Sequence, residues 1–109
     1  NEETYAAALP QVLALLRREA PKARLIFCTT TDVRERNNLE KVSPKTERMI
    51  RRNALVTAFA KREAIPVDDL FAVVQNHPEY HAADGVHFNE AGSTVLAAQV
   101  ATELRKLLP

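Results

Sequence analysis

The length, composition and charge of the chain exclude several classes of protein. Its 109 residues suffice for one modest hydrophobic core, and a hydrophobic content of 46% is far too high for a disordered chain. Fifteen Lys and Arg against fourteen Asp and Glu leave a formal net charge of +1, with no basic stripe for nucleic acid and no apolar run of the roughly 18 to 20 residues that span a membrane.

The first part of the chain predicts a helix followed by a buried strand. Apolar residues recur with the spacing of an amphipathic helix at Tyr5, Leu9, Val12, Leu13 and Leu16. Pro10 either kinks this helix or marks a fresh start, and Pro21 follows its end. Residues 25–30 are apolar on both faces, which favours a buried parallel strand. The single cysteine, Cys28, is interpreted as a small buried hydrophobe within this strand.

The middle of the chain predicts a loop and a second helix. Residues 31–42 are polar and charged without a sustained period, which indicates a long loop. Ser43 and Pro44 form a helix opening, with a cap followed by a first-turn proline, and the helix should run to about Glu63. Asn53 is the strongly polar residue of its apolar face. We expect a buried amide that satisfies loop backbone groups, with a direct substrate contact as the alternative.

The last part of the chain predicts a second strand and a final helix. Residues 65–70 form the strand, and Asp68 and Asp69 lie near its carboxyl end. Residues 71–74 are expected to form a short helix or turn, and residues 75–81 a polar loop. Asn89 caps the last helix, whose stripe comprises Gly92, Leu96, Val100, Leu104 and Leu107.

Strands that alternate with helices predict an α/β fold with right-handed parallel crossovers and a sheet covered on both faces. Two central-type strands alone leave two open edges, so the sequence expects neighbouring strands that it does not contain. In such sheets ligands bind beyond the carboxyl ends of the strands. This rim should hold Thr30, Thr31 and the following loop, with Asp68 and Asp69 beside them, and the loop of Asp84 and His87 should reach it.

The stretch from Asp84 to Gly92 combines both glycines of the chain with a histidine and a nearby acid. Asp84 precedes His87 by three residues on a turn that Gly85 makes possible. A carboxylate in this position can hold an imidazole in one tautomer and leave its other nitrogen free for proton transfer. The pair is therefore half of a candidate catalytic site.

This stretch resembles the carboxyl-terminal part of the SGNH hydrolase superfamily, also called GDSL esterases and lipases. The last sequence block of that superfamily carries Asp-x-x-His, and Asp84 and His87 match both positions. The resemblance extends through Phe88 and Asn89 to Gly92, and the order of strands and helices agrees along essentially the whole chain.

The resemblance implies a three-layer α/β/α fold of flavodoxin-like type in which a serine attacks an ester carbonyl without a cofactor. His87 would act as general base and then general acid, and Asp84 would orient its ring. The substrate would be an acyl or acetyl ester, with esters on carbohydrate included. Thr30 and Thr31 are candidate substrate-binding residues, and the charged segment 32–40 is a candidate determinant of specificity.

The chain departs from the superfamily in one decisive way. The Gly-Asp-Ser nucleophile block, the oxyanion glycine and the Gly-x-Asn-Asp block lie upstream in the family and are absent here. Neither of the two serines, Ser43 and Ser93, has the sequence context of a nucleophile turn. We therefore expect residues 1–109 to be the carboxyl-terminal portion of a single SGNH-like domain. Its amino-terminal half would be supplied by the same polypeptide or a second chain, and the isolated chain would be inactive.

Three alternatives stay open at the level of sequence. Asp84 and His87 could merely fix a turn before the last helix. A metal site could draw on the histidines with Asp84 or Glu79, although the spacing of His77, His81 and His87 matches no compact zinc pattern. A non-catalytic α/β binding module would show an exposed apolar sheet edge. The cellular compartment is open between cytoplasm and secreted or periplasmic space.

Overall fold

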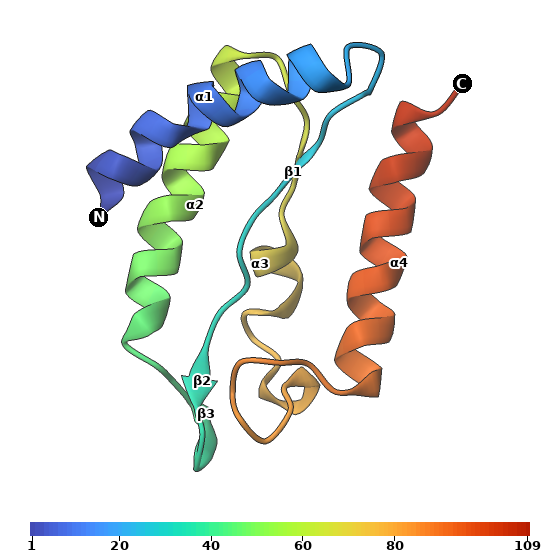
Figure 1. Cartoon of the computed structure of the whole chain (residues 1–109). Helices are drawn as coiled ribbons and strands as arrows, with labels where there is room; N and C mark the ends of the chain where they lie inside the picture. The colour runs from blue at the N-terminus through green and yellow to red at the C-terminus, as the bar shows by residue number, and fades with distance from the viewer.

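The computed structural model describes all residues, 1–109, and shows helices on both sides of a pair of strands (Figure 1). The elements follow in the order α1 (Glu2–Glu19), β1 (Phe27–Cys28), β2 (Arg34–Glu35), β3 (Asn38–Val42), α2 (Lys45–Arg62), β4 (Val67–Asp68), α3 (Leu70–Val74), the 3₁₀ helix η1 (Pro78–Tyr80) and α4 (Glu90–Leu107). α1 and α2 lie on one side of β1 and β4, and α4 lies on the other. The predicted α/β class with helices on both faces is confirmed.

β1 and β4 are parallel neighbours, as predicted, although each strand is shorter than its apolar run. Phe27 pairs with Val67, and Cys28 pairs with Asp68. The predicted strand 65–70 is too long at its carboxyl end, because the Asp69 side chain accepts a hydrogen bond from the Ala72 N–H at 3.2 Å and starts α3 there. Residues 71–74 accordingly form a helix rather than a simple turn.

The long helices agree with the sequence except for details within α1 and at the ends of α2. α1 continues through Pro10 as one helix, so neither a fresh start nor a break occurs there. Ser43 is not the residue at the cap position of α2, which Pro44 occupies, but its hydroxyl accepts a hydrogen bond from the Lys45 N–H at 3.3 Å. α2 ends at Arg62, one residue before the predicted end.

The prediction of a long loop over residues 31–42 is wrong. β2 and β3 form an antiparallel hairpin with a two-residue turn, and Arg34 pairs with Val42 and Glu35 with Asn38. The hairpin lacks an apolar face because Val42 and most of β3 are exposed, so the alternation that signals a half-buried strand is absent. Its backbone ladder and the buried side chain of Arg34 hold it instead.

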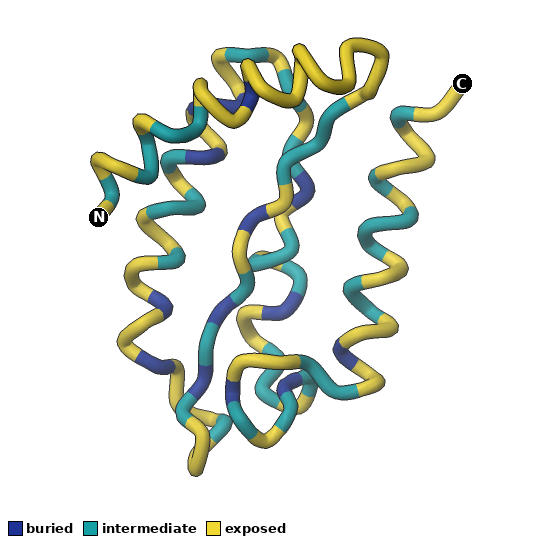
Figure 2. Tube along the Cα trace, viewed as in Figure 1, coloured by how far each residue is buried: buried dark blue, intermediate teal, exposed yellow.

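The hydrophobic core of the chain is small, and most of the chain is exposed or only partly buried (Figure 2). Only five apolar residues are buried, namely Leu13, Val56, Phe59, Ala60 and Val74. The radius of gyration is 15.2 Å, against roughly 13 Å for a compact domain of this length. Cys28, predicted to be buried, is exposed because no further element covers its side of the strand pair. No helix has the length and apolar character needed to cross a membrane.

Candidate active site

Asp84 and His87 are joined in the geometry that their spacing predicts. Asp84 Oδ2 lies 2.5 Å from His87 Nδ1. The other carboxylate oxygen, Oδ1, accepts hydrogen bonds from the backbone N–H groups of Val86 at 2.8 Å and His87 at 2.9 Å. The carboxylate therefore fixes the turn and the ring together, and no hydrogen bond within the chain engages His87 Nε2.

The ring of His87 is presented to solvent while its partner is partly covered. The side chain of His87 is 79% exposed, and that of Asp84 is 33% exposed. The hydrogen bond from His87, followed by the two backbone hydrogen bonds, holds the pKa of the Asp84 carboxyl well below its usual range. Asp84 is thus a carboxylate at neutral pH, able to orient the imidazole and to stabilise its protonated form.

Gly85 allows the loop to lie directly against the β2–β3 hairpin. Its φ of +77° belongs to the left-handed region that favours glycine, and a Cβ atom here would lie 2.1 Å from the carbonyl oxygen of Arg34. The backbone N–H of Arg34 donates a hydrogen bond to the Gly85 carbonyl oxygen at 2.8 Å. The loop therefore reaches the segment that follows β1, as the sequence predicts.

The loop is closed at its base by the residues that precede α4. The Ala82 N–H donates to the His87 carbonyl oxygen at 2.7 Å. Asn89 caps α4 by accepting from the Gly92 N–H at 2.9 Å, and its Nδ2 donates to the Glu79 carbonyl oxygen at 2.7 Å. Asn89 therefore links the helix to the segment before the loop and confirms the predicted cap.

A shallow groove of about 610 Å³, lined mostly by polar and charged residues, runs beside His87. Its walls come from the hairpin, the start of α2 and the Asp84 loop: Val33, Arg34, Glu35, Arg36, Ser43, Pro44, Lys45, Asp84, Val86 and His87. The groove contains charges of both signs, so the exposed histidine borders a surface suited to a polar ligand.

The family is decided by comparison with known proteins. A model of the GDSL-like lipase/acylhydrolase family matches residues 1–95. The chain belongs to this family. No curated protein matches its sequence.

Solved structures resemble this GDSL-like chain in fold at low sequence identity. The esterase domain of the ORF1 protein from the zebrafish ZfL2-1 retrotransposon is 18% identical, with a TM-score of 0.85 over 97% of this chain and 60% of that one. A GDSL-like lipase from Bacteroides thetaiotaomicron is 22% identical, with a TM-score of 0.75 over 99% of this chain and 54% of that one. LAE5, an alpha/beta hydrolase enzyme from the metagenome of Lake Arreo in Spain, is 24% identical, with a TM-score of 0.69 over 94% and 46%. The chain thus spans about half of the solved structures that it matches.

Other polar residues predicted at the rim of the GDSL-like sheet do not join His87. Thr30 and Thr31 are absent from the groove, and both backbone groups of Thr30 are held by the Asn53 amide at 2.8 Å. Asn53 therefore satisfies loop backbone groups, as expected, but its amide is only partly covered rather than buried. A role of Thr30 and Thr31 in substrate binding stays a prediction.

The two aspartates at the end of β4 have structural partners. Asp68 is buried and accepts a hydrogen bond from Gln99 of α4 at 3.0 Å. Asp69 caps α3 and accepts from the Thr29 hydroxyl at 2.9 Å. Both side chains therefore connect elements of the fold rather than face the groove.

The three histidines lie in three different environments and do not form a metal site. His77 stacks on Tyr80, with ring centroids 4.6 Å apart, and pairs with Glu79 at 2.6 Å. His81 is buried against Phe88, whereas His87 is exposed on Asp84. No group of three His, Cys, Asp or Glu side chains comes together in residues 1–109. The geometry gives the metal alternative no support.

The sequence did not predict the buried ion pair of Asp32 and Arg34 or the burial of His81 beside it. Arg34 Nε lies 2.7 Å from Asp32 Oδ2, and both side chains are nearly inaccessible to solvent. The polar neighbours of these residues indicate loops rather than buried positions. The sequence feature that could have indicated the pair is that Asp32 and Arg34 are two positions apart, which puts both side chains on one face of an extended segment.

Neither serine of the chain is hydrogen-bonded to His87. The hydroxyl of Ser43, which borders the groove, accepts from the Lys45 N–H, and Ser93 lies exposed in the first turn of α4. The chain therefore pairs Asp84 with His87 without a serine hydroxyl hydrogen-bonded to the histidine ring.

Proposed function

We propose that this chain is the carboxyl-terminal part of a single SGNH-type domain whose complete form is a serine ester hydrolase. The observation that carries the proposal is the 2.5 Å pairing of Asp84 Oδ2 with His87 Nδ1, which leaves Nε2 of an exposed ring free. Membership of the GDSL-like lipase/acylhydrolase family supports the same reaction class.

In the proposed mechanism, His87 moves a proton twice. Nε2 accepts the proton of a serine hydroxyl located outside residues 1–109 while the serine oxygen attacks the ester carbonyl. The protonated ring then donates that proton to the leaving alkoxide as the tetrahedral intermediate collapses to an acyl-enzyme. Nε2 then takes a proton from water as the water oxygen attacks the acyl carbonyl, and it gives this proton to the serine oxygen as the bond to the acyl group breaks and the acid leaves.

Asp84 holds the ring through Nδ1 throughout this cycle. Its carboxylate keeps Nδ1 as the protonated nitrogen, so that Nε2 is the acceptor, and stabilises the imidazolium that forms. The donors that stabilise the oxyanion are proposed to accompany the serine outside this chain. Substrates are acyl or acetyl esters, including esters on carbohydrate, with the polar groove beside His87 as the binding surface for the rest of the substrate.

Replacement of His87 by Ala in the full-length protein tests the mechanism. We expect kcat for p-nitrophenyl acetate to fall by about three orders of magnitude or more, because the base is removed, while the thermal unfolding midpoint changes little for a side chain that is 79% exposed. His77→Ala is the matched control, since His77 also pairs with an acid on the surface. A His87→Ala protein with the wild-type rate would remove His87 from the mechanism.

A further inference from the structure

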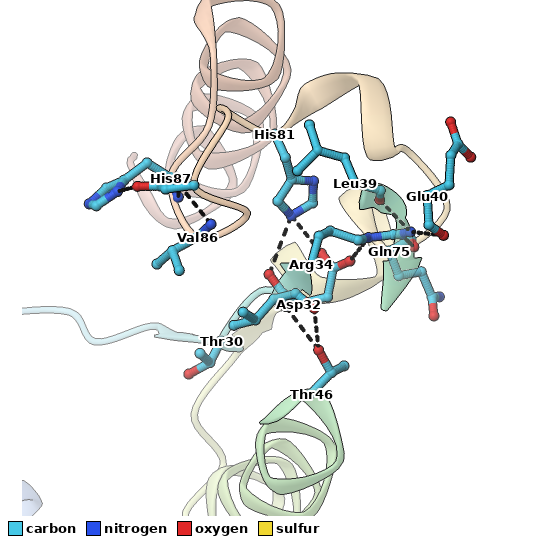
Figure 3. A network of polar contacts seen from close by, with 12 residues as sticks. Thr30, Asp32, Arg34, Leu39, Glu40, Thr46, Gln75, His81, Val86 and His87 are labelled. Carbon is cyan, nitrogen blue, oxygen red and sulfur yellow. Dashed lines mark hydrogen bonds and ion pairs between the residues drawn. The ribbon is translucent and has the colours of Figure 1, made fainter. Parts of the chain in front are cut away.

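A buried cluster of three polar side chains lies behind the Asp84 loop (Figure 3). The exposed fractions of the Asp32, Arg34 and His81 side chains are 1%, 5% and 0%. Arg34 Nε donates to Asp32 Oδ2 at 2.7 Å. His81 Nε2 lies 3.3 Å from the carbonyl oxygen of Asp32 and 3.4 Å from its Oδ1. Asp32 therefore joins the hairpin to the segment that leads into the loop.

Arg34 connects four parts of the chain. Its guanidinium donates to the carbonyl oxygens of Leu39 and Glu40, both at 3.5 Å, and to that of Gln75 after α3. Its backbone N–H donates to Gly85, whose Cα lies directly against the Arg34 carbonyl. The position of the Arg34 main chain thus sets the position of the residue between Asp84 and Val86.

His81 holds the other side of the same loop. It pairs with Phe88 in an isolated antiparallel bridge, and their rings pack with centroids 4.6 Å apart. Its Nδ1 is buried without a hydrogen-bond partner. The ring therefore contacts the network only through Nε2, and the six residues between His81 and Phe88 are anchored from both ends.

The energetics favour a role in positioning over a role in stability. A buried ion pair is often no more stabilising than well-packed apolar residues of similar volume, and an unpaired buried nitrogen is unfavourable. The Arg34 side chain bonds to Asp32 and to carbonyl oxygens of β3 and Gln75, and these bonds fix the Arg34 main chain, whose N–H donates to Gly85 in the loop. His87 points away from the network in Figure 3, so its members do not touch the ring.

We propose that Asp32, Arg34 and His81 are positioning residues that hold the Asp84–His87 loop in the geometry required for proton transfer. The proposal rests on the hydrolase function inferred above. It assigns to the hairpin, which lies far from the loop in sequence, control over the rate of the chemical step.

The test is the double variant Asp32→Asn/Arg34→Gln in the full-length protein, which removes both buried charges and leaves neither unpaired. We expect kcat for p-nitrophenyl acetate to fall about tenfold to a hundredfold, with KM changed by less than about twofold, because a small displacement of the base affects the transition state more than binding. Hydrogen exchange of the Val86 and His87 amides, which donate to Asp84, should become at least about tenfold faster.

The matched control is Arg18→Gln/Glu19→Gln, which removes an exposed ion pair of α1. We expect it to leave kcat and the exchange of both loop amides unchanged. If the buried double variant does not fold, His81→Gln decides the question, because it keeps the Asp32–Arg34 pair. A smaller fall in kcat with faster exchange of the loop amides in His81→Gln supports the proposal. A folded variant with wild-type kcat and wild-type amide exchange overturns it.

The two measurements separate this proposal from the proposed function. Full activity of His87→Ala would reject the hydrolase mechanism. Faster amide exchange in the double variant would still show that the network positions the loop. Loss of activity in His87→Ala with an unaffected double variant would reject the network alone.

Discussion

Asp84 uses its two carboxylate oxygens for two different tasks. Oδ1 closes the turn by accepting two backbone N–H groups, and Oδ2 orients His87. A side chain that is fixed by the turn it creates needs little reorganisation when charge develops on the neighbouring ring. The same short stretch of sequence therefore supplies both the acid and the scaffold that holds it.

The lowered pKa of Asp84 predicts how this residue responds to acid. Its hydrogen bond to His87 and the two backbone hydrogen bonds favour the charged carboxylate, whereas an unfolded Asp has a pKa of about 3.9. Its contribution to stability is therefore fully present above about pH 4 and is lost as the pH falls through the lower pKa of the folded state. An NMR titration of the full-length protein should show the Asp84 carboxyl still ionised at pH 3.

The corresponding stability measurement uses Asp84→Asn. The difference in unfolding free energy between wild type and variant should be constant between about pH 5 and 6 and shrink below about pH 4. A midpoint for Asp84 at or above 4 in the NMR titration would contradict the assigned hydrogen bonds.

At the scale of elements, the start of α4 is fixed by a close approach rather than by helix propensity. A Cβ atom on Gly92 would lie 2.4 Å from the Tyr80 carbonyl oxygen and 2.8 Å from the Tyr80 Cβ. Glycine is therefore required where η1 crosses the first turn of the helix. This contact brings the segment before the loop against the helix after it.

Gly92→Ala should destabilise the full-length protein, although alanine is the better helix former by about 1 kcal/mol. The backbone of Tyr80 must move to accept the new methyl group, and we expect a net loss of about 1–3 kcal/mol, as for other overpacked sites. Urea denaturation measures the change. Ser93→Ala, one residue further along the same helix and exposed, is the control and should be neutral or slightly stabilising. A stabilised Gly92→Ala protein would show that the close approach is absent.

The hairpin illustrates which elements the sequence could not reveal. β1, β4 and the three long helices follow from apolar runs or helical spacing, which reflect burial against neighbouring elements. β2 and β3 are stabilised by backbone pairing and by Arg34, and polar strands of this kind have no hydrophobic signal. Short strands held by polar contacts are therefore identified only when their partners are in place.

At the scale of the whole molecule, the chain leaves apolar helix surface and both edges of its parallel strand pair uncovered. Large apolar side chains remain exposed on both α1 and α2, and β1 and β4 have no further neighbours in the sheet. Solved relatives extend over about twice the length of this chain. These observations support the proposal that further strands and the nucleophile come from outside residues 1–109.

The isolated 109-residue chain should hydrolyse p-nitrophenyl acetate no faster than the buffer does. It holds the proposed base and its carboxylate, but neither of its serines is hydrogen-bonded to His87. The measurement compares the purified chain with its His87→Ala variant at equal concentration. Turnover by the chain that His87→Ala abolishes would show that the nucleophile lies within these residues.

The sequence by itself determined the α/β class, the three long helices, the cap at Asn89 and the pairing of Asp84 with His87. Each of these depends on contacts between near neighbours or on the burial of one face, which leave a periodic or closely spaced pattern. Only the tertiary structure decided that Arg34 supports Gly85, that His81 is buried on Asp32 and that Cys28 is exposed. The first two are contacts between residues far apart in the chain, and the exposure of Cys28 depends on which elements pack beside β1. A local sequence pattern predicts neither.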